Sequence, residues 1–433
     1  MRLSFSVMMC VMALLSVSSI HAYSNGLGAR PPMGHSTWCT NDGICGLLFE
    51  LCWEDEIRQQ AQALVDSGMR DLGYNLELLD DCWAAKNRSA SGELQPDPTR
   101  FPSGMKKLAD DIHAMGIKIG LYTCIGTQTC KNNLPGSFGH YDIDAKTFVS
   151  WGIDYVKADN CNKPSDFTEQ QLFSNFSFYL NKTSVEAGHP LWFSLCEWGV
   201  SDVISWGGTV ANMYRIQQDH LPLWDCGAPI CQGPTGWGGP GFGQGTKQII
   251  EYVATLPQEL WSGPNTATQG FGDPDFLMTM YPVTFDVTKS QSEFSFWALW
   301  SAPLIVATDM ANMTSEKRQI LANTAVIAVD QDPLGKPGYR LFNNSDGTQM
   351  WLKNCADGSL VVLLYNGDEF SQQVVNVSPS WRSVLGTTTL PLNVTSMNGT
   401  DLWEASRSMG LDPSKPYSIA LQPTQVQMLR LSW

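Results

Sequence analysis

Four clusters of polar side chains follow apolar runs in this 433-residue sequence, and they are the groups that could do chemistry. In a parallel barrel, residues that follow a strand gather at one face of the protein, where active sites form. Carboxylates can accept hydrogen bonds from vicinal hydroxyl groups, and an aromatic ring offers a flat face to a sugar ring. The clusters are Asp80 and Asp81 with Trp83; Lys157 with Asp159, Asn160 and Cys161; Cys196 with Glu197 and Trp198; and Arg215 with Asp219. This combination indicates a site for a sugar.

Paired carboxyl groups are what the hydrolysis of a glycosidic bond requires. An enzyme that retains the anomeric configuration holds them about 5–5.5 Å apart, on opposite sides of the anomeric carbon. One carboxyl must be ionised to attack, and the other must carry a proton for the leaving oxygen. Lys157 lies two residues before Asp159 and therefore on the same strand face, where its charge would favour the ionised form of Asp159. The alternative for these two residues is an ordinary ion pair at a strand end.

A repeated helix–glycine–strand unit precedes and positions these clusters. Helices are predicted over 54–68, 102–115 and 142–151, and strands over 74–79, 117–122, 153–158, 191–195, 213–217 and 303–308. The glycines after the helices match left-handed C-caps, and the apolar strands match a parallel sheet that is covered on both faces. No G-x-G-x-x-G fingerprint opens a first strand–helix turn, so we predict a (β/α)₈ TIM barrel over residues 23–335.

The sequence pattern changes after about residue 335. Helical patterns vanish, and short β-rich runs such as 359–365 alternate with Asn, Gly, Asp and Ser turns. Residues 336–433 are therefore predicted to form an antiparallel β-sandwich domain. Within the barrel, the Gly- and Pro-rich stretch 226–245 predicts a long irregular loop that a Cys226–Cys231 bridge would close.

The N-terminus and the overall charge indicate a secreted protein. Arg2, an apolar run over 7–17 and Ala22 predict a signal peptide over residues 1–22. No later stretch approaches about 18 uninterrupted apolar residues, so no membrane span is expected. The net charge of −15 argues against nucleic acid or an anionic membrane as a partner. Eight N-x-S/T sequons fit a glycoprotein that is secreted or delivered to a lysosome or vacuole: Asn87, Asn175, Asn181, Asn312, Asn343, Asn376, Asn393 and Asn398.

Cysteine usage indicates disulfide bonds and not a metal site. Of the 12 cysteines, Cys10 would leave with the signal peptide, so an odd number remains and at least one thiol stays unpaired. The spacings do not resemble a zinc ribbon or finger, and we expect no metal and no other cofactor. Two bridges are possible among four cysteines near the first strand, with the connectivity open: Cys39, Cys45, Cys52 and Cys82.

Four blocks of sequence together resemble the α-galactosidases of glycoside hydrolase family 27. They read LDDCW at 79–83, YVKADNC at 155–161, CEWG at 196–199 and QDPLG at 331–335, and the resemblance runs in matching order from about residue 25 to 339. It implies a (β/α)₈ barrel followed by a β domain. It also implies cofactor-free, retaining hydrolysis of terminal α-D-galactose from oligosaccharides, polysaccharides or glycolipids, by double displacement.

The resemblance also implies a role for each site residue. Asp159, in the block K-x-D-x-C, would be the nucleophile, and Asp219, four residues after Arg215, would be the general acid/base. Asp80 and Asp81 would bind the 6- and 4-hydroxyls of galactose, Lys157 the 3- and 4-hydroxyls, and Glu197 with Arg215 the 2-hydroxyl. Trp38 and Tyr122 would form the walls of the pocket, with Cys161 as a further contact. A Cys130–Cys161 bridge would lie beside the nucleophile, and Cys124, Cys196 and Cys355 would stay unpaired.

Two segments depart from the family's pattern. The usual M-G-W-N-S-W is MGHSTW at 33–38, so His35 stands where the family has its first Trp, and we expect it to be packed or hydrogen-bonded, not catalytic. The usual G-x-W-N-D-P-D-M-L is GFGDPDFL at 270–277, which alters the contribution of the seventh strand. Asp273 and Asp275 in that segment are too few to predict a calcium site.

Two alternatives to an α-galactosidase stay within the same fold. An α-N-acetylgalactosaminidase would keep small residues where this chain has Glu197. A catalytically silent sugar-binding protein would have no need of both Asp159 and Asp219. The chain is expected to act as a monomer or a homodimer.

Overall fold

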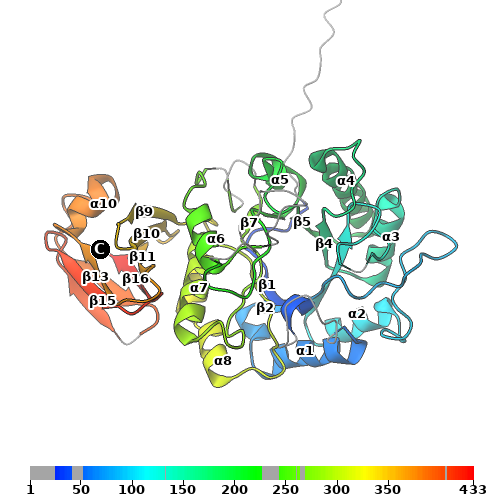
Figure 1. Cartoon of the computed structure of the whole chain (residues 1–433), viewed down its shortest axis with the longest axis horizontal. Coiled ribbons are helices and arrows are strands. Elements are labelled where there is room, and N and C mark those ends of the chain that lie inside the picture. The colour runs from blue at the N-terminus through cyan, green and yellow to red at the C-terminus, as the bar shows by residue number, and fades with distance from the viewer. Residues whose placement is uncertain are drawn as a thin grey trace, which may run out of the picture.

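A computed structural model describes residues 25–40, 52–131, 133–226, 243–259, 261–263, 269–404 and 407–433. Figure 1 shows a barrel of strands ringed by helices, with a smaller β domain beside it. The predicted signal peptide, Cys45, Cys231 and most of the predicted loop 226–245 lie outside the described residues. Among the described helices, none is long and apolar enough to cross a membrane.

Eight parallel strands form the barrel wall in the order β7-β6-β5-β4-β3-β2-β1-β8. They are β1 (Met33–Ser36), β2 (Tyr74–Leu79), β3 (Lys118–Cys124), β4 (Tyr155–Asp159), β5 (Trp192–Cys196), β6 (Met213–Arg215), β7 (Phe271–Asp273) and β8 (Leu304–Val306). Beyond the end of β7, Leu277 donates its N–H to the carbonyl of Ile305 at 2.9 Å and accepts from the N–H of Ala307 at 3.0 Å. These bonds join the first and last strands of the order, and the predicted (β/α)₈ barrel is confirmed.

Helices follow the strands and cover the outside of the barrel (Figure 1). They are α1 (Glu54–Asp66), α2 (Met105–Ala114), α3 (Tyr141–Trp151), α4 (Glu169–Ala187), α5 (Val203–Val210), α6 (Thr246–Val253), α7 (Val287–Trp300), α8 (Ser315–Leu321) and α9 (Thr324–Asp330), with 3₁₀ turns η1 (Thr37–Cys39) and η2 (Arg70–Leu72). The predicted helices and strands agree with these apart from their terminal residues. Gly152 ends α3 with φ 78°, a left-handed conformation that suits glycine, as predicted.

The C-terminal domain packs a six-stranded sheet, β14-β13-β16-β11-β10-β9, and the pair β12-β15, all antiparallel. The elements are β9 (Tyr339–Asn343), β10 (Thr348–Asn354), β11 (Leu360–Asn366), β12 (Gln373–Val377), α10 (Trp381–Thr389), β13 (Met397–Asp401), β14 (Ser408–Leu411), β15 (Tyr417–Leu421) and β16 (Val426–Ser432). The predicted boundary at residues 335/336 falls between α9 and β9. Helix α10 was not expected; the Ser380 hydroxyl caps it, and it is held by the burial of Trp381 and Leu385 more than by a periodic pattern.

Helix α7 joins the two domains through a shared apolar core. Nearly every side chain from Ser290 to Trp300 is buried, because the barrel covers one side of α7 and strands β10, β11 and β16 cover the other. The ring of Phe296 lies 5.4 Å from that of Trp351 and 5.1 Å from that of Tyr365, both edge-on. The β domain therefore completes the hydrophobic layer around the barrel on this side.

An ion pair anchors the loop after β2 to helix α3. Two guanidinium nitrogens of Arg88 donate to the carboxylate of Asp144 at 2.6 and 2.8 Å, and the same nitrogens donate to the carbonyls of Gly92 and Gly136. The Asp144 side chain is fully buried, and burial raises its pKa even though Arg88 opposes the shift. Arg88 thus holds together the loops that follow β2 and β3.

Replacing Arg88 with Ala is expected to lower the free energy of unfolding by about 3 kcal/mol, because Asp144 would stay buried without its cation. Lys106→Ala is the matched control: it removes an exposed ion pair with Asp110 and should cost less than about 1 kcal/mol. Urea unfolding monitored by tryptophan fluorescence measures both values. Equal losses in the two variants would show that the Arg88–Asp144 pair has no special importance.

Candidate active site

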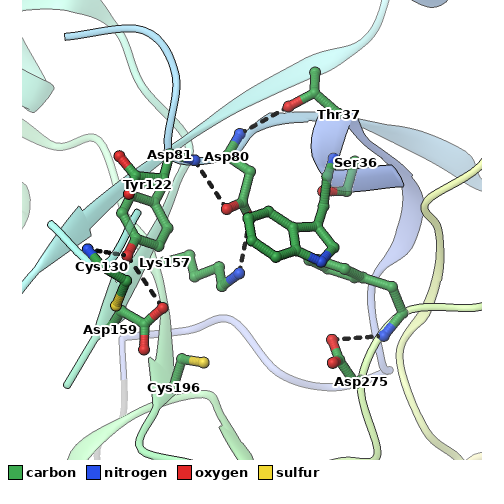
Figure 2. Close-up of polar contacts among 12 residues, drawn as sticks. Ser36, Thr37, Asp80, Asp81, Tyr122, Cys130, Lys157, Asp159, Cys196 and Asp275 are labelled. Carbon is green, nitrogen blue, oxygen red and sulfur yellow. Dashed lines mark hydrogen bonds and ion pairs between the residues drawn. The ribbon is translucent and has the colours of Figure 1, made fainter. Parts of the chain in front are cut away.

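The sequence-predicted residues meet at the carboxyl ends of the barrel strands. Asp80 and Asp81 follow β2, Tyr122 lies in β3, and Lys157 and Asp159 lie in β4. Figure 2 shows these five side chains around one space, with Asp275 on its opposite side. The remaining predicted residues come from the same end of the barrel: Trp38 in η1, Glu197 after β5, Arg215 at the end of β6 and Asp219 after it.

Asp159 is a buried carboxyl group with a hydrogen-bond donor on each oxygen. The hydroxyl of Tyr122 donates to Oδ2 at 3.1 Å (Figure 2), and the N–H of Asn160 donates to Oδ1 at 2.9 Å. Burial raises its pKa to about 7, and the negative charge of Asp219 adds to the effect, while Lys157 opposes it. Lys157 favours the ionised form of Asp159, as expected, but desolvation outweighs its effect in the free protein.

Lys157 pairs directly with Asp80. Its ammonium lies 2.7 Å from Oδ2 of Asp80, and it also lies over the rings of Trp38, Tyr122 and Phe276 at 5.8, 5.3 and 4.9 Å. Burial alone would lower the pKa of Lys157, but the carboxylates around it raise the pKa well above the ordinary value. Lys157 is thus a permanent positive charge enclosed by aromatic walls.

Backbone N–H groups orient the carboxylates of both Asp80 and Asp81. The N–H of Asp80 donates to the hydroxyl of Thr37 at 3.0 Å, and Oδ1 of Asp80 accepts from the N–H of Asp81 at 2.8 Å. Oδ2 of Asp81 accepts from the N–H of Lys131, also at 2.8 Å. The two carboxylates therefore have set directions before any ligand binds, as bidentate recognition of a sugar's hydroxyls requires.

Arg215 bridges two carboxylates at the other side of the site. Its Nη2 lies 3.1 Å from Oδ1 of Asp219 and 3.0 Å from Oδ2 of Asp275, which also accepts from the N–H of His220 at 2.7 Å. The side chain of Asp219 is 38% exposed, whereas those of Arg215 and Asp275 are buried. Desolvation and the charge of Asp275 raise the pKa of Asp219, and Arg215 opposes them.

Asp275 is a site residue that was not predicted from the sequence. Asp275 lies two residues beyond β7, with φ +83°. The pattern Asp-Pro-Asp after a short apolar run was visible, but its partner Arg215 is 60 positions away in the sequence. Only the adjacency of β6 and β7 in the barrel brings the two residues together.

Glu197 is buried, not solvent-facing. Its side chain is fully inaccessible, and neither carboxyl oxygen has a hydrogen-bond partner among the described residues. Burial raises its pKa to about 10, and the charge of Glu169 adds to this, whereas the charge of Arg215 opposes it. A neutral Glu197 can donate as well as accept a hydrogen bond.

Further buried polar atoms without a partner among the described residues follow the neighbouring strands. They are Oδ1 of Asn160 after β4, and Nε of Arg215 and Nε2 of Gln217 at and after β6. Buried polar groups are nearly always hydrogen-bonded in a complete structure. Those at the ends of β4, β5 and β6 could form hydrogen bonds with the hydroxyl groups of a ligand.

The cysteines near the site pair as the sequence resemblance implies. Cys130 forms a disulfide with Cys161, and Cys52 forms one with Cys82, which settles part of the open connectivity. Cys39 and Cys226 are also disulfide-bonded. Cys124, Cys196 and Cys355 are free and buried, as predicted. Cys130, Asp159 and Cys161 lie close enough to suggest a metal site, but the disulfide removes both thiolates.

Comparisons with known proteins show which family the chain resembles. Residues 30–332 match the alpha galactosidase A family, and residues 345–431 match the alpha galactosidase C-terminal beta sandwich domain. The chain is 34% identical over 385 residues to the alpha-galactosidase of Cyamopsis tetragonoloba, covering 88% of this chain and 82% of that protein. It is 36% identical over 359 residues to the probable alpha-galactosidase of Dictyostelium discoideum, covering 83% of each.

A solved structure extends the similarity to the whole fold. Alpha-galactosidase I from Mortierella vinacea superposes with a TM-score of 0.82 at 31% identity, over 94% of this chain and 98% of that chain. The matched length includes the barrel, the strand ends that hold the carboxylates, and the β-sandwich domain. The chain therefore belongs to the α-galactosidases of glycoside hydrolase family 27.

Proposed function

We propose that the protein is a retaining glycosidase that releases terminal α-linked D-galactose, with Asp159 as the nucleophile and Asp219 as the general acid/base. The observation that carries the proposal is the difference between these two carboxyl groups. Asp159 is buried and held by two donors, whereas Asp219 is partly exposed and held by Arg215. The charge of Asp219 raises the pKa of Asp159, and the charge of Asp275 raises that of Asp219, so these crowded carboxyl groups favour keeping a proton.

The reaction follows from this arrangement in two displacements. Asp159 as carboxylate attacks the anomeric carbon, and protonated Asp219 gives its proton to the departing glycosidic oxygen, leaving a galactosyl ester on Asp159. Asp219, now ionised, takes a proton from a water molecule, which attacks the same carbon and releases galactose with its configuration retained. The hydrogen bonds from Tyr122 and Asn160 stabilise Asp159 each time it becomes a carboxylate.

Recognition of the sugar would rest on the groups around the pair. Asp80, Asp81 and Lys157 would bind the hydroxyls at carbons 6, 4 and 3, since each is already oriented by a neighbour. Arg215 and Glu197 would bind the 2-hydroxyl, and Trp38 and Tyr122 would form the walls. Cys161 would contribute a disulfide sulfur or its backbone, because it has no free thiol.

An α-N-acetylgalactosaminidase is the alternative within this fold. Its N-acetyl group would need space at the end of β5, where this chain buries a glutamate. We prefer the galactosidase because an unsubstituted 2-hydroxyl could pair with Glu197, whereas an acetamido group would add volume beside it.

We also propose that the protein enters the secretory pathway through its N-terminal signal and acts outside the cell or in a lysosome or vacuole. Buried disulfides beside free buried thiols are consistent with an oxidising compartment. A monomer or a homodimer remains the prediction for its assembly, with α-galactosides of oligosaccharides, polysaccharides or glycolipids as substrates.

Asp159→Ala is expected to reduce kcat on p-nitrophenyl α-galactoside by about 10⁴-fold or more, because the first displacement loses its nucleophile. Galactose should still bind, measured by calorimetry, and azide should restore turnover with an inverted product. The control is Asp330→Asn, which alters a buried carboxyl group at the other end of the barrel, where Gln331 contacts Pro31 ahead of β1. Near-normal turnover in Asp159→Ala would refute the assignment.

The pH profile of kcat/KM should be bell-shaped, and its acid limb should report the ionisation of Asp159. Removing the charge of Asp219 should lower the pKa of Asp159, because that charge raises it in the free protein. In Asp219→Asn the acid limb should therefore move to lower pH and the alkaline limb should vanish. An activated aryl galactoside, which needs little acid assistance, makes the measurement possible. An acid limb that stays in place or moves upward would contradict the pairing of these two carboxyl groups.

Replacing Glu197 with Ser and Val200 with Ala should shift specificity from α-galactosides toward α-N-acetylgalactosaminides. The loss on the galactoside should be about 1 kcal/mol, roughly a fivefold fall in kcat/KM, because a neutral Glu197 makes an uncharged hydrogen bond to the 2-hydroxyl. Both p-nitrophenyl substrates are assayed with the double variant and with Val200→Ala alone as the control. An unchanged ratio of the two activities would remove Glu197 from the site.

A further inference from the structure

A fully buried histidine and a fully buried glutamate pair across strands β1 and β2. Nδ1 of His35 lies 2.9 and 3.0 Å from the two carboxyl oxygens of Glu77, and Nε2 lies 3.0 Å from the hydroxyl of Thr40. Both side chains have 0% exposure. Glu77 is embedded in the apolar run 76–79, and His35 stands where the family's motif has a tryptophan.

The three side chains form a directional chain of hydrogen bonds. The Thr40 hydroxyl donates its single hydrogen to the carbonyl of Ser36 at 2.9 Å. Because that hydrogen is already used, Nε2 of His35 must donate to the Thr40 oxygen. A second proton then lies between Nδ1 and Glu77, as an imidazolium–carboxylate pair or a neutral imidazole with a carboxylic acid. In both forms the pair is neutral overall, as deep burial requires.

This chain of hydrogen bonds lies on the outer face of the barrel sheet, away from the pocket. Tyr122 faces the pocket, and Gly120, two residues earlier in β3, lies on the same inner face of the sheet. Gly120 pairs with Leu78 of β2, so Leu78 also lies on the inner face. The neighbouring Glu77 therefore points to the outer face, together with its own partner His35 of β1. Helix α1 packs against β2 on that outer face.

The turn η1 connects this outer chain to the pocket. Thr40 follows η1 and donates to the carbonyl of Ser36, and the Ser36 hydroxyl accepts from the N–H of Trp38 at 3.4 Å. Within the same turn, the Thr37 hydroxyl accepts from the N–H of Asp80 (Figure 2). Ser36 at the end of β1 and Thr37 at the start of η1 therefore hold a pocket wall and one of the sugar-binding carboxylates.

We propose that Glu77, acting through His35 and Thr40, is a positioning residue that holds η1, and with it Trp38 and Asp80, in the geometry that binds the sugar. This inference rests on the proposed function for the identity of the ligand. A 3₁₀ turn of three residues has little stability of its own, so its geometry depends on such tertiary bonds. Glu77 does not itself contact the pocket, and it acts on affinity through the turn.

Thr40 is not a nucleophile in a second catalytic triad, although a carboxyl, an imidazole and a hydroxyl stand in that order. Its side chain is 1% exposed, and its proton is committed to the carbonyl of Ser36. The remaining alternative is a buried polar pair that stabilises the fold and leaves the pocket unaffected.

Four variants separate the positioning role from plain stabilisation. Glu77→Leu and Thr40→Val break opposite ends of the chain, and Glu77→Gln keeps a donor toward Nδ1. Asp330→Leu is the matched control, because it also replaces a fully buried carboxyl group but lies at the far end of the barrel. The readouts are kcat and KM on p-nitrophenyl α-galactoside, and galactose affinity by calorimetry, all at a temperature where each variant is folded.

A positioning role predicts that KM rises about tenfold in Glu77→Leu and in Thr40→Val, with kcat changed much less, because ground-state binding is lost. The double variant should be no worse than either single variant, since both interrupt one chain. Glu77→Gln should keep KM within about twofold of the unaltered protein. Asp330→Leu should lower the melting temperature and leave KM unchanged.

Unchanged KM in Thr40→Val, additive losses in the double variant, or an equal rise of KM in Asp330→Leu would overturn the inference. Should Glu77→Leu fail to fold, Thr40→Val and Glu77→Gln decide the question without it. An unaltered protein that neither hydrolyses the α-galactoside nor binds galactose would instead refute the proposed function, which keeps the two failures distinct.

Discussion

The structure depends on two buried cations that allow several carboxyl groups to crowd the mouth of one barrel. Lys157 forms an ion pair with Asp80, and Arg215 forms ion pairs with both Asp219 and Asp275. Without these charges, desolvation would protonate the carboxyl groups or unfold the strand ends. Within the described part of the chain Asp159 has no direct ion-pair partner, and its raised pKa shows the effect of burial on a carboxyl group held mainly by hydrogen bonds.

The barrel keeps these charges at fixed distances because they lie in, or directly after, neighbouring strands of one closed sheet. Lys157 and Asp159 share β4, whereas their partners follow β2, β6 and β7 or end β6. The aromatic wall comes from both kinds of segment, since Tyr122 lies in β3 and Trp38 lies in η1. The β domain contributes indirectly, by covering the outer side of α7 and so burying the helix that adjoins the last strands.

Much of this arrangement could be predicted from local patterns. The helix and strand ranges, the (β/α)₈ barrel and the β-sandwich agree with the structure, and so does the Cys130–Cys161 bridge that the family resemblance implied. The site residues Asp80, Tyr122, Lys157 and Asp159 lie together as the motifs implied. Helix α10 was missed because it is short, capped by one serine and interrupted at Gly386, which leaves no helical period to detect.

The sequence by itself determined the elements and the chemical types at their ends, because hydrophobic period, glycine caps and short motifs are local properties of a chain. Tertiary structure alone decided which charges meet. Asp275 pairs with Arg215, and Glu77 with His35, only because β6 adjoins β7 and β1 adjoins β2. The tertiary structure also decided which groups carry a proton. A pKa depends on burial and on charged neighbours that are distant in the chain, and the local sequence specifies neither.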